Sequence, residues 1–428
     1  MVLLFFLILV ILLVLNVPVA ISIGGASLAL LLMKELPIVL IAQQMYEGCD
    51  SFTLLAIPFF LLAGNLMDFA GISLRVVNFV NSFFGFVRGG LAMVSVGACM
   101  FFAGISGSAT ADSAAIGSIV IPSMIKKGYD RDFSAALVAA AGVMGPIIPP
   151  SITFVIYGVI SNTSIAELFL AGAIPGVMIG LSLMIISYIF AIKRNYPKET
   201  GVPFQQKVFH TKRATLAIIM PLIILGGILG GIFTPTEASV VAVIYAFVVG
   251  KWVYKELKFG DLKEILLRSA DSTAQVMWVL AAATVATWLI ISENIPFVIT
   301  NFLLSLTTNK FLLLALINVV LFIAGTFLDP PPAMIMLVPV LLPIAQKLGI
   351  DPVHFGVIVN VNLVIGLITP PSAPCLMVTA AISGGSFGRI SVVVLPFLAV
   401  ELLVLIIVTY FPQIYMWLPL WYRAAVRG

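Results

Sequence analysis

The chain has 428 residues, of which 61% are hydrophobic and only 9% are charged, whereas a soluble globular domain carries about 25% charged residues. This composition excludes an ordinary soluble protein, and the small excess of 22 basic over 18 acidic residues gives no reason to expect nucleic acid as a partner. The apolar runs are long and do not alternate with polar residues, so they predict membrane-spanning helices instead of barrel strands.

Apolar segments are predicted to enter or cross the membrane along the whole chain. They lie at 2–15, 18–33, 52–71, 90–126, 132–160, 165–192, 214–232, 236–254, 269–291, 310–346, 353–382 and 390–411. The first lacks the basic region and the cleavage site of a signal peptide, so we interpret it as a helix. Shorter segments with one apolar face separate them, at 35–49, 73–87, 255–268, 294–306 and 413–427.

Two basic stretches predict the orientation of the chain. Lysines and arginines are densest at 193–213, which is also the only polar loop that we expect, and again at 251–268. Both stretches should face the cytoplasm, because cytoplasmic loops carry an excess of Lys and Arg. The helices 214–232 and 236–254 between them then form a hairpin that crosses the membrane and returns.

The chain contains an internal repeat with an offset of 221 residues. Pro122 matches Pro343, and Pro149-Pro150-Ser151 matches Pro370-Pro371-Ser372. Matched prolines are significant because proline recurs for backbone reasons. The first repeat is predicted at 1–210, with scaffold helices in 1–87, a hairpin and a broken helix in 88–161, a closing helix at 165–192 and the polar loop 193–210. The second is predicted at 211–428, with the corresponding parts at 211–306, 309–383 and 388–428.

The segments 90–126 and 310–346 predict how the two repeats are related. Each is long enough for two short helices, and each is interrupted midway by Gly-rich or Pro-rich sequence, at 104–112 and 325–332. Basic residues at both ends of 90–126 predict that it dips into the membrane and returns. Each repeat then crosses five times, which makes the second repeat inverted. The alternative is a simple bundle of full spans with glycine kinks, but two interruptions at matched positions favour an inverted-repeat transporter.

Two further interruptions, at 145–151 and 366–372, predict sodium sites. Proline removes backbone donors and leaves carbonyl oxygens that a hard cation can bind. We predict one sodium site where the first hairpin tip meets the first break, at Ser106, Ser108, Gly145, Ile148 and Pro150. A second is predicted at Gly325, Leu328, Gly366, Thr369 and Pro371. The alternative interpretation is that the double prolines only kink their helices.

Carboxylates near the tips are candidates for function, because ionisable groups inside a membrane are costly. Asp112 could add charge to a cation site, cap a half-helix or titrate. No Lys or Arg lies at either tip or break, so an anionic substrate would be held by sodium, helix N-termini and polar side chains. The candidate substrate residues are Ser108, Thr110, Ser151, Asp329, Ser372 and Thr379. Asn360 and Asn362 are more typical of bonds between helices.

Several chemistries have no counterpart in the sequence. No phosphate-binding loop of an ATPase is present, and His210 and His354 are predicted in separate loops. We find no nucleophile–base pair and no spacing of transition-metal ligands. The sequence therefore predicts a protein that is not an enzyme and that needs no cofactor or metal beyond sodium as a coupling ion.

Four motifs together resemble a known family. The segments 104–112, 145–151, 325–330 and 366–372 are similar to those of the large, M-type membrane subunit of tripartite ATP-independent periplasmic (TRAP) transporters. The resemblance covers essentially the whole chain. It implies a location in the bacterial inner membrane, a small four-helix membrane subunit and a periplasmic substrate-binding protein as partners, and an elevator movement. It also implies a carboxylate substrate, with sialic acid as the best guess and a C4-dicarboxylate otherwise.

We therefore expect an all-α polytopic membrane protein that takes up a small organic acid at the expense of a sodium gradient, in contact with membrane lipid. Two alternatives stay open from the residues. One is a stand-alone sodium/dicarboxylate symporter of a related inverted-repeat fold. The other is a membrane scaffold that transports nothing.

Overall fold

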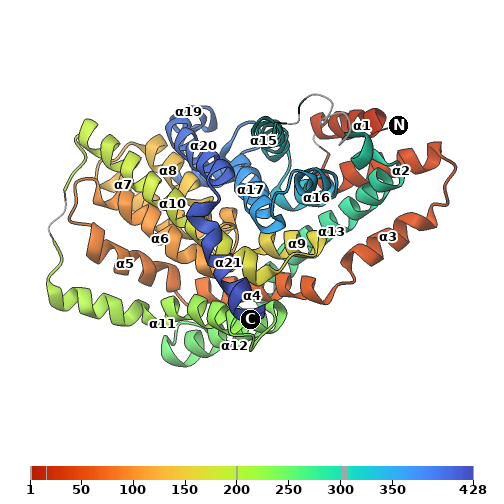
Figure 1. Cartoon of the computed structure of the whole chain (residues 1–428). Coiled ribbons are helices and arrows are strands. Elements are labelled where there is room, and N and C mark those ends of the chain that lie inside the picture. Colours follow the sequence, from red (N-terminus) through yellow and green to blue (C-terminus); the bar gives the residue numbers. More distant parts are fainter. Residues whose placement is uncertain (1, 16, 199–200, 300–306, 308, 428) are drawn as a thin grey trace.

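The computed structural model describes residues 2–15, 17–198, 201–299, 307 and 309–427, and this part of the chain is helical with no β-strand (Figure 1). Six helices are long and apolar enough to cross a membrane, or up to eight if each of two bent pairs counts as one span. The prediction of an all-α polytopic membrane protein is confirmed.

The predicted scaffold regions of both repeats pack on one another. In the first repeat the helices are α1 (Val2–Val14), α2 (Val19–Met33), α3 (Val39–Cys49), the short 3-10 turn η1 (Phe52–Leu55), α4 (Ala56–Phe69) and α5 (Ile72–Phe84). In the second they are α11 (Phe204–Leu229), α12 (Pro235–Val248), the π-turn η2 (Val249–Val253) and α13 (Asp261–Ser292). α4 packs on α12, α5 on α11, and α13 on α2, α3 and α4. Several of these helices lie along the lower and right-hand rim in Figure 1.

The remaining helices contain the predicted hairpins and broken helices. In the first repeat they are α6 (Gly90–Ser106), α7 (Ala109–Lys126), α8 (Arg131–Gly142), α9 (Ile152–Ser161) and α10 (Ile165–Lys193). In the second they are α15 (Lys310–Phe327), α16 (Pro330–Lys347), α17 (Pro352–Ile365), η3 (Gly366–Ile368), α18 (Pro374–Ser383), α19 (Phe387–Val393), α20 (Leu395–Tyr410) and α21 (Gln413–Arg427). Both long segments and both later helices are interrupted, as predicted.

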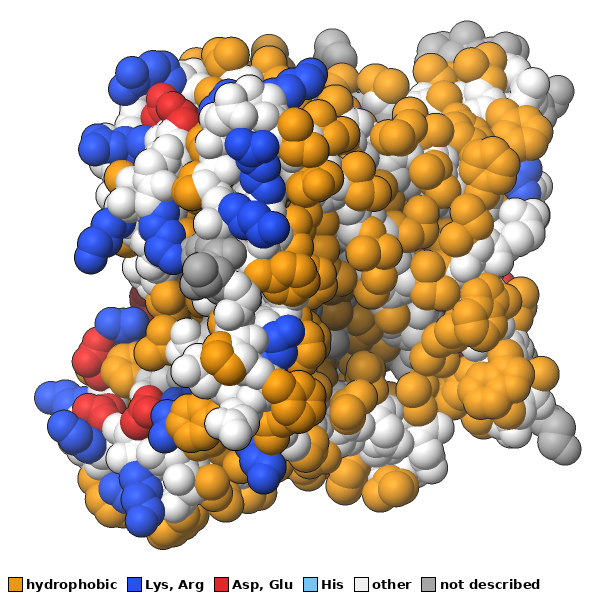
Figure 2. Space-filling model, turned by 90° about the vertical axis from the view of Figure 1, so that its left-hand side faces the viewer, with side chains coloured by type: hydrophobic (Ala, Val, Ile, Leu, Met, Phe, Trp, Pro, Cys, Tyr) orange, Lys and Arg blue, Asp and Glu red, His pale blue; other side chains and the backbone are white. Residues whose placement is uncertain are grey.

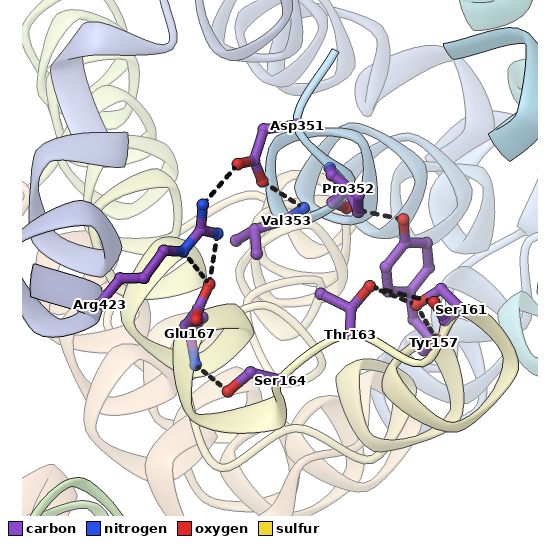
Figure 3. A network of polar contacts seen from close by, with 9 residues as sticks. All are labelled: Tyr157, Ser161, Thr163, Ser164, Glu167, Asp351, Pro352, Val353 and Arg423. Carbon is purple, nitrogen blue, oxygen red and sulfur yellow. Dashed lines mark hydrogen bonds and ion pairs between the residues drawn. The ribbon is translucent and has the colours of Figure 1, made fainter. Parts of the chain in front are cut away.

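Two ion-pair clusters show that the repeats are inverted. Asp130 caps the start of α8 and lies 3.9 Å from Arg194, at the C-terminal end of α10. Asp351 caps the matching start of α17 and pairs with Arg423, whose guanidinium also binds Glu167 in the first turn of α10 (Figure 3). α10 has 29 residues and is therefore about 43 Å long. The two broken helices thus begin at opposite ends of the same spanning helix.

The repeats also exchange their packing partners. α9 of the first repeat packs against α16 of the second, and α18 of the second packs against the equivalent α7 of the first. Each broken helix therefore has one half beside its own hairpin and the other half beside the hairpin of the other repeat. This reciprocal arrangement is what a pseudo-two-fold axis produces, and it brings all four interruptions into the interior.

The charges on the surface agree with the predicted orientation. Figure 2 shows Lys and Arg side chains gathered along one side of the visible face, beside a broad hydrophobic surface. Exposed basic residues lie at the C-terminal end of α10 and at the start of α11, for example Lys193, Lys198 and Lys212. A basic border next to an apolar band is typical of the cytoplasmic membrane boundary.

The structure corrects three details of the sequence analysis. The segments 255–268 and 269–291 share one continuous helix, α13, because no glycine or proline occurs between Asp261 and Ser292 to end it. The polar loop 193–210 is shorter than predicted, because α11 already begins at Phe204. His210 and His354 lie in α11 and α17 instead of in loops. Of the predicted segment 294–306, residues 300–306 lie outside the described residues.

Candidate functional site

The tip of the first hairpin is a tight turn between α6 and α7. Gly107 has φ +63°, the left-handed conformation that ends α6, and Ser108 begins α7 in an extended conformation. The Ser108 hydroxyl accepts from the amide of Ala111 as the helix cap. Helix capping, one of the alternatives for Asp112, is therefore performed by Ser108 instead.

Asp112 points back into this turn. It is fully buried, and one carboxylate oxygen, Oδ1, accepts a hydrogen bond from the Ser106 hydroxyl. The other oxygen, Oδ2, is buried and has no hydrogen-bond partner in the described chain. A buried carboxylate oxygen without a partner is costly unless a proton or a cation satisfies it. The hairpin tip thus contains a ready anionic ligand.

The first break lies directly against this tip. A β carbon on Gly145 would lie 2.7 Å from Oδ2 of Asp112 and 2.9 Å from the carbonyl oxygen of Ser108. One turn further on, the carbonyl oxygen of Pro150 lies 3.1 Å from the β-carbon position of Gly107. Because Gly145 has no side chain, its backbone can pack directly against both oxygens. The structure therefore brings together Ser106, Ser108, Gly145 and Pro150 of the first predicted sodium site.

Ile148 occupies a different side of the break. Its amide bonds to the carbonyl of Met144, and its side chain contacts Gly176 on α10. Within the described chain the carbonyls of Gly145, Ile148 and Pro150 accept no hydrogen bond. The backbone of the break thus presents bare oxygens, as the proline pattern indicated.

The carbonyl of Pro146 does not follow this pattern. It accepts hydrogen bonds from the side chains of Ser151 at 2.5 Å and Asn360 at 2.7 Å. The Thr153 hydroxyl lies nearby and donates to Oδ1 of Asn360 at 2.6 Å. The amide of Asn360 comes from α17 of the other repeat, so the interpretation of this residue as a link between helices is confirmed. A carbonyl with two donors has both lone pairs occupied and no need of a cation. The idea that every oxygen freed by proline is bare is therefore wrong here.

The second tip meets its break through two glycines. Gly325 near the end of α15 and Gly366 in η3 touch, and a β carbon on Gly366 would overlap with the carbonyl group of Gly325. The hydroxyl of Ser372 donates to the carbonyl of Thr326 at 2.7 Å and fastens the break to the tip. The hydroxyl of Thr369 donates a hydrogen bond to the carbonyl of Ile365, at 3.1 Å. Leu328 ends α15, and Pro371 follows Pro370 in the break.

The two predicted sodium sites are therefore not equivalent. The position that matches Asp112 is Ala333, so the second hairpin offers no carboxylate one turn into its second helix. Asp329, which matches Ser108, sits at the second tip, but its side chain makes no capping bond and is exposed. The first site is the one with a buried negative charge, and the second consists of backbone and hydroxyl oxygens.

Apart from Ser372, whose hydroxyl donates to the carbonyl of Thr326, the candidate substrate residues fall into two groups. The hydroxyls of Ser108 and Thr110 lie 3.3 Å apart and are half-buried at the first tip, and Asp329 is exposed at the second. In contrast, Ser151 and Thr379 are fully buried, and their hydroxyls donate to main-chain carbonyls of Pro146 and Cys375. Only the first group presents polar atoms that a substrate could reach in this conformation.

Asp112 is the residue that the predicted sodium site omitted. A signal was present in the sequence, because an acidic residue four positions after the tip serine lies on the same helix face and one turn away. The pattern alone did not decide between a cap and a ligand, since that depends on which residue adopts the extended conformation. Among the described residues no group of three or more His, Cys, Asp or Glu could hold a transition metal.

The contact between Gly366 and Gly325 leads to a first prediction. Replacing Gly366 by alanine should lower the thermal unfolding temperature, with a cost of about 1–3 kcal/mol, because a methyl group forces the tip and the break apart. Differential scanning fluorimetry of the purified protein measures this. The matched control is Gly226→Ala on α11, where a β carbon meets nothing within 4 Å. Equal unfolding temperatures for the two variants would contradict the close contact.

Known proteins resemble this chain over most of its length. The family model of the DctM component of tripartite ATP-independent periplasmic transporters matches residues 6–414. The chain is 42% identical over 405 residues to the sialic acid TRAP transporter large permease protein SiaM of Vibrio cholerae, covering 94% of this chain and 95% of that one. It is 40% identical over 397 residues to the C4-dicarboxylate permease DctM of Pseudomonas aeruginosa, with 93% of each chain covered.

Two further comparisons concern a longer relative and a solved structure. The isethionate TRAP transporter permease protein DctMQ of Oleidesulfovibrio alaskensis is 44% identical over 404 residues, which is 94% of this chain, but the match spans only 64% of that protein. The crystal structure of the YdaH transporter of Alcanivorax borkumensis superimposes with a TM-score of 0.66 at 16% identity, over 89% of this chain and 88% of that one. The latter likeness concerns the fold alone.

Proposed function

Because the chain belongs to the DctM family of tripartite ATP-independent periplasmic (TRAP) transporters, an inner-membrane family, we propose that it uses a sodium gradient to take up a small organic anion. The observation that carries the proposal is the first hairpin tip. There a buried carboxylate oxygen of Asp112 without a partner in the described chain, the carbonyl of Ser108 and the backbone of Gly145 lie close together. Carboxylate and carbonyl oxygens are suitable ligands for a hard cation, and no lysine or arginine competes for them.

An elevator movement is the mechanism that we propose for this uptake. The hairpins pack on the broken helices, and the scaffold helices α2, α3, α4, α12 and α13 pack on one another. The contacts of α6 with α4 and α5, and of α16 with α13, form the boundary between the two groups. Sodium at the tips would join hairpin and break, and the joined unit would carry the substrate across as a rigid body. The binding site is then formed in part by bound sodium, which links the two solutes energetically.

The substrate class follows from the exposed tip residues and from the names of the relatives. Those names include isethionate, C4-dicarboxylate and sialic acid, at 44%, 40% and 42% identity, so identity does not choose among them. All three are small anions. We propose sialic acid as the first candidate substrate and a C4-dicarboxylate as the second. The isethionate relative adds short sulfonates to the substrates that should be tested.

Two partners complete the proposed transporter. One is a small four-helix Q-type membrane subunit, and the other is a periplasmic P-type binding protein that delivers the ligand. No basic side chain lies at the tips to attract an anion from bulk water. Delivery by a separate binding protein would supply the anion to the tips without the need for a basic side chain there.

Proteoliposomes containing both membrane subunits test the function. With an inward sodium gradient and the binding protein present, labelled sialic acid, a C4-dicarboxylate or isethionate should accumulate. A potassium gradient of the same size is the control and should drive none. Uptake that persists without the binding protein would favour a stand-alone symporter. Absence of sodium-driven uptake for the whole panel would support a membrane scaffold and refute the proposal.

A further inference from the structure

Glu401 is a carboxylate without a partner inside the helix bundle. It lies near the middle of α20, is fully buried, and neither Oε1 nor Oε2 has a hydrogen-bond partner in the described chain. α20 packs against α10, α17 and α8. A charge at such a position would lose its hydration without compensation, which is among the largest unfavourable terms in a folded protein. Something must therefore neutralise Glu401.

A second buried polar group without a hydrogen-bond partner in the described chain lies on α10, at the same depth along the helix pair as Glu401. The rings of Phe190 on α10 and Phe397 on α20 are in contact, with centroids 5.9 Å apart. The two helices run antiparallel, since α20 ends where Tyr415 pairs with His354, beside the N-terminal end of α10. One turn inward from the ring contact, α20 carries Glu401 and α10 carries Ser187. Ser187 is also fully buried and its hydroxyl has no partner in the described chain.

The nearby charges do not neutralise Glu401. On the elements packed against α20 the titratable or charged groups are Glu167, Tyr188 and Lys193 on α10, Arg131 and Asp132 on α8, His354 on α17 and Arg389 on α19. Glu167 is engaged by Arg423, Asp132 by Arg389, and His354 by Tyr415. None of these groups bonds to Glu401. The thiol of Cys375 on α18 is near enough to interact electrostatically with it, but a thiol supplies no positive charge.

Two small cations could neutralise the carboxylate, a proton or sodium. Sodium needs several oxygen ligands, whereas α10, α17 and α20 are unbroken helices beside Glu401 and keep their carbonyls in helical hydrogen bonds. On α10, α17 and α20 the buried side-chain oxygens without a partner among the described residues are those of Glu401, Ser187 and Asn362. Asn362 lies beside Asn318, which bonds to Thr409 about two turns along α20 from Glu401, so too few oxygens remain for sodium. A proton requires only one of them. We propose that Glu401 is a proton-binding site in this part of the transporter, held as a neutral acid in the layer that it shares with Ser187.

Infrared difference spectroscopy of the purified wild-type chain against Glu401→Gln tests the proposal directly. The wild-type protein should show the carbonyl band of a protonated carboxylic acid, shifted in heavy water, and the variant should lose it. Glutamine has the same shape and no charge, so the variant should unfold at the wild-type temperature. A difference spectrum without this band would overturn the proposal.

Two further infrared measurements vary the cation and replace Ser187. The band should be the same with sodium or with choline as the only cation, and its appearance only after sodium removal would assign the site to sodium instead. Ser187→Ala should move the band by making the surroundings of the acid less polar, and an unmoved band would remove Ser187 from the site. If Glu401→Gln fails to fold, Glu401→Met provides the same spectral subtraction.

Uptake gives an independent readout. A neutral acid is present at low pH and is lost when alkaline pH ionises it. Wild-type uptake should therefore fall at alkaline pH, whereas Glu401→Gln, which cannot ionise, should keep its uptake there. This comparison rests on the proposed function, but the infrared band does not, so failure of transport and failure of the proton site are distinguishable. Identical alkaline loss in both proteins would count against the proton site.

Discussion

Replacing Asp112 by asparagine is expected to abolish sodium-driven uptake at ordinary sodium concentrations while the protein stays folded. The amide keeps the size of the side chain and can still accept from Ser106. It replaces a bare carboxylate oxygen, next to Gly145 and the Ser108 carbonyl, by an uncharged group. Loss of a charge-assisted contact of about 1.5–3 kcal/mol corresponds to a rise of about tenfold or more in the sodium needed for half-maximal uptake.

Sodium titration of uptake in proteoliposomes measures this shift. Asp68→Asn is a suitable control, because Asp68 lies at the end of α4 and only accepts from the hydroxyl of Ser73, at 2.7 Å. It should leave the sodium dependence unchanged. If Asp112→Asn and wild type required the same sodium concentration, the first tip would not be a sodium site.

A disulfide between positions 104 and 221 is expected to stop uptake completely in the oxidised state. Gly104 lies on α6 near the first tip, and Pro221 lies on the scaffold helix α11. A β carbon at Gly104 would be 3.3 Å from that of Pro221, close to the separation of about 3.5–4.5 Å in a disulfide. A covalent bond across this boundary prevents any sliding of the hairpin past the scaffold, and reduction should restore uptake.

The experiment needs a background without Cys49, Cys99 and Cys375, which are free. A disulfide within the scaffold is the control. Positions 250 and 257 are suitable, with β carbons 3.4 Å apart, and that bond should not affect uptake because both ends stay fixed relative to each other. Undiminished uptake by the oxidised 104–221 pair would refute movement across this boundary.

The amino-acid sequence alone determined the class of the molecule and the places where its helices stop. Membrane helices follow from composition, since no other solvent accepts so much apolar surface. The interruptions follow from glycine and proline, whose effects on the backbone are local and therefore visible in the sequence. The offset of 221 residues predicted the matched hairpins for the same reason.

The tertiary structure decided what each interruption can bind. Whether the Pro146 carbonyl is bare depends on Asn360, which lies 214 residues away in the sequence. Asp112 is a candidate ligand because Ser108 performs the capping and Gly145 packs against both. Ser151 looked like a substrate contact but is buried as a helix cap. Such outcomes depend on contacts between distant segments, and a local pattern contains no information about which partner will satisfy a given polar atom.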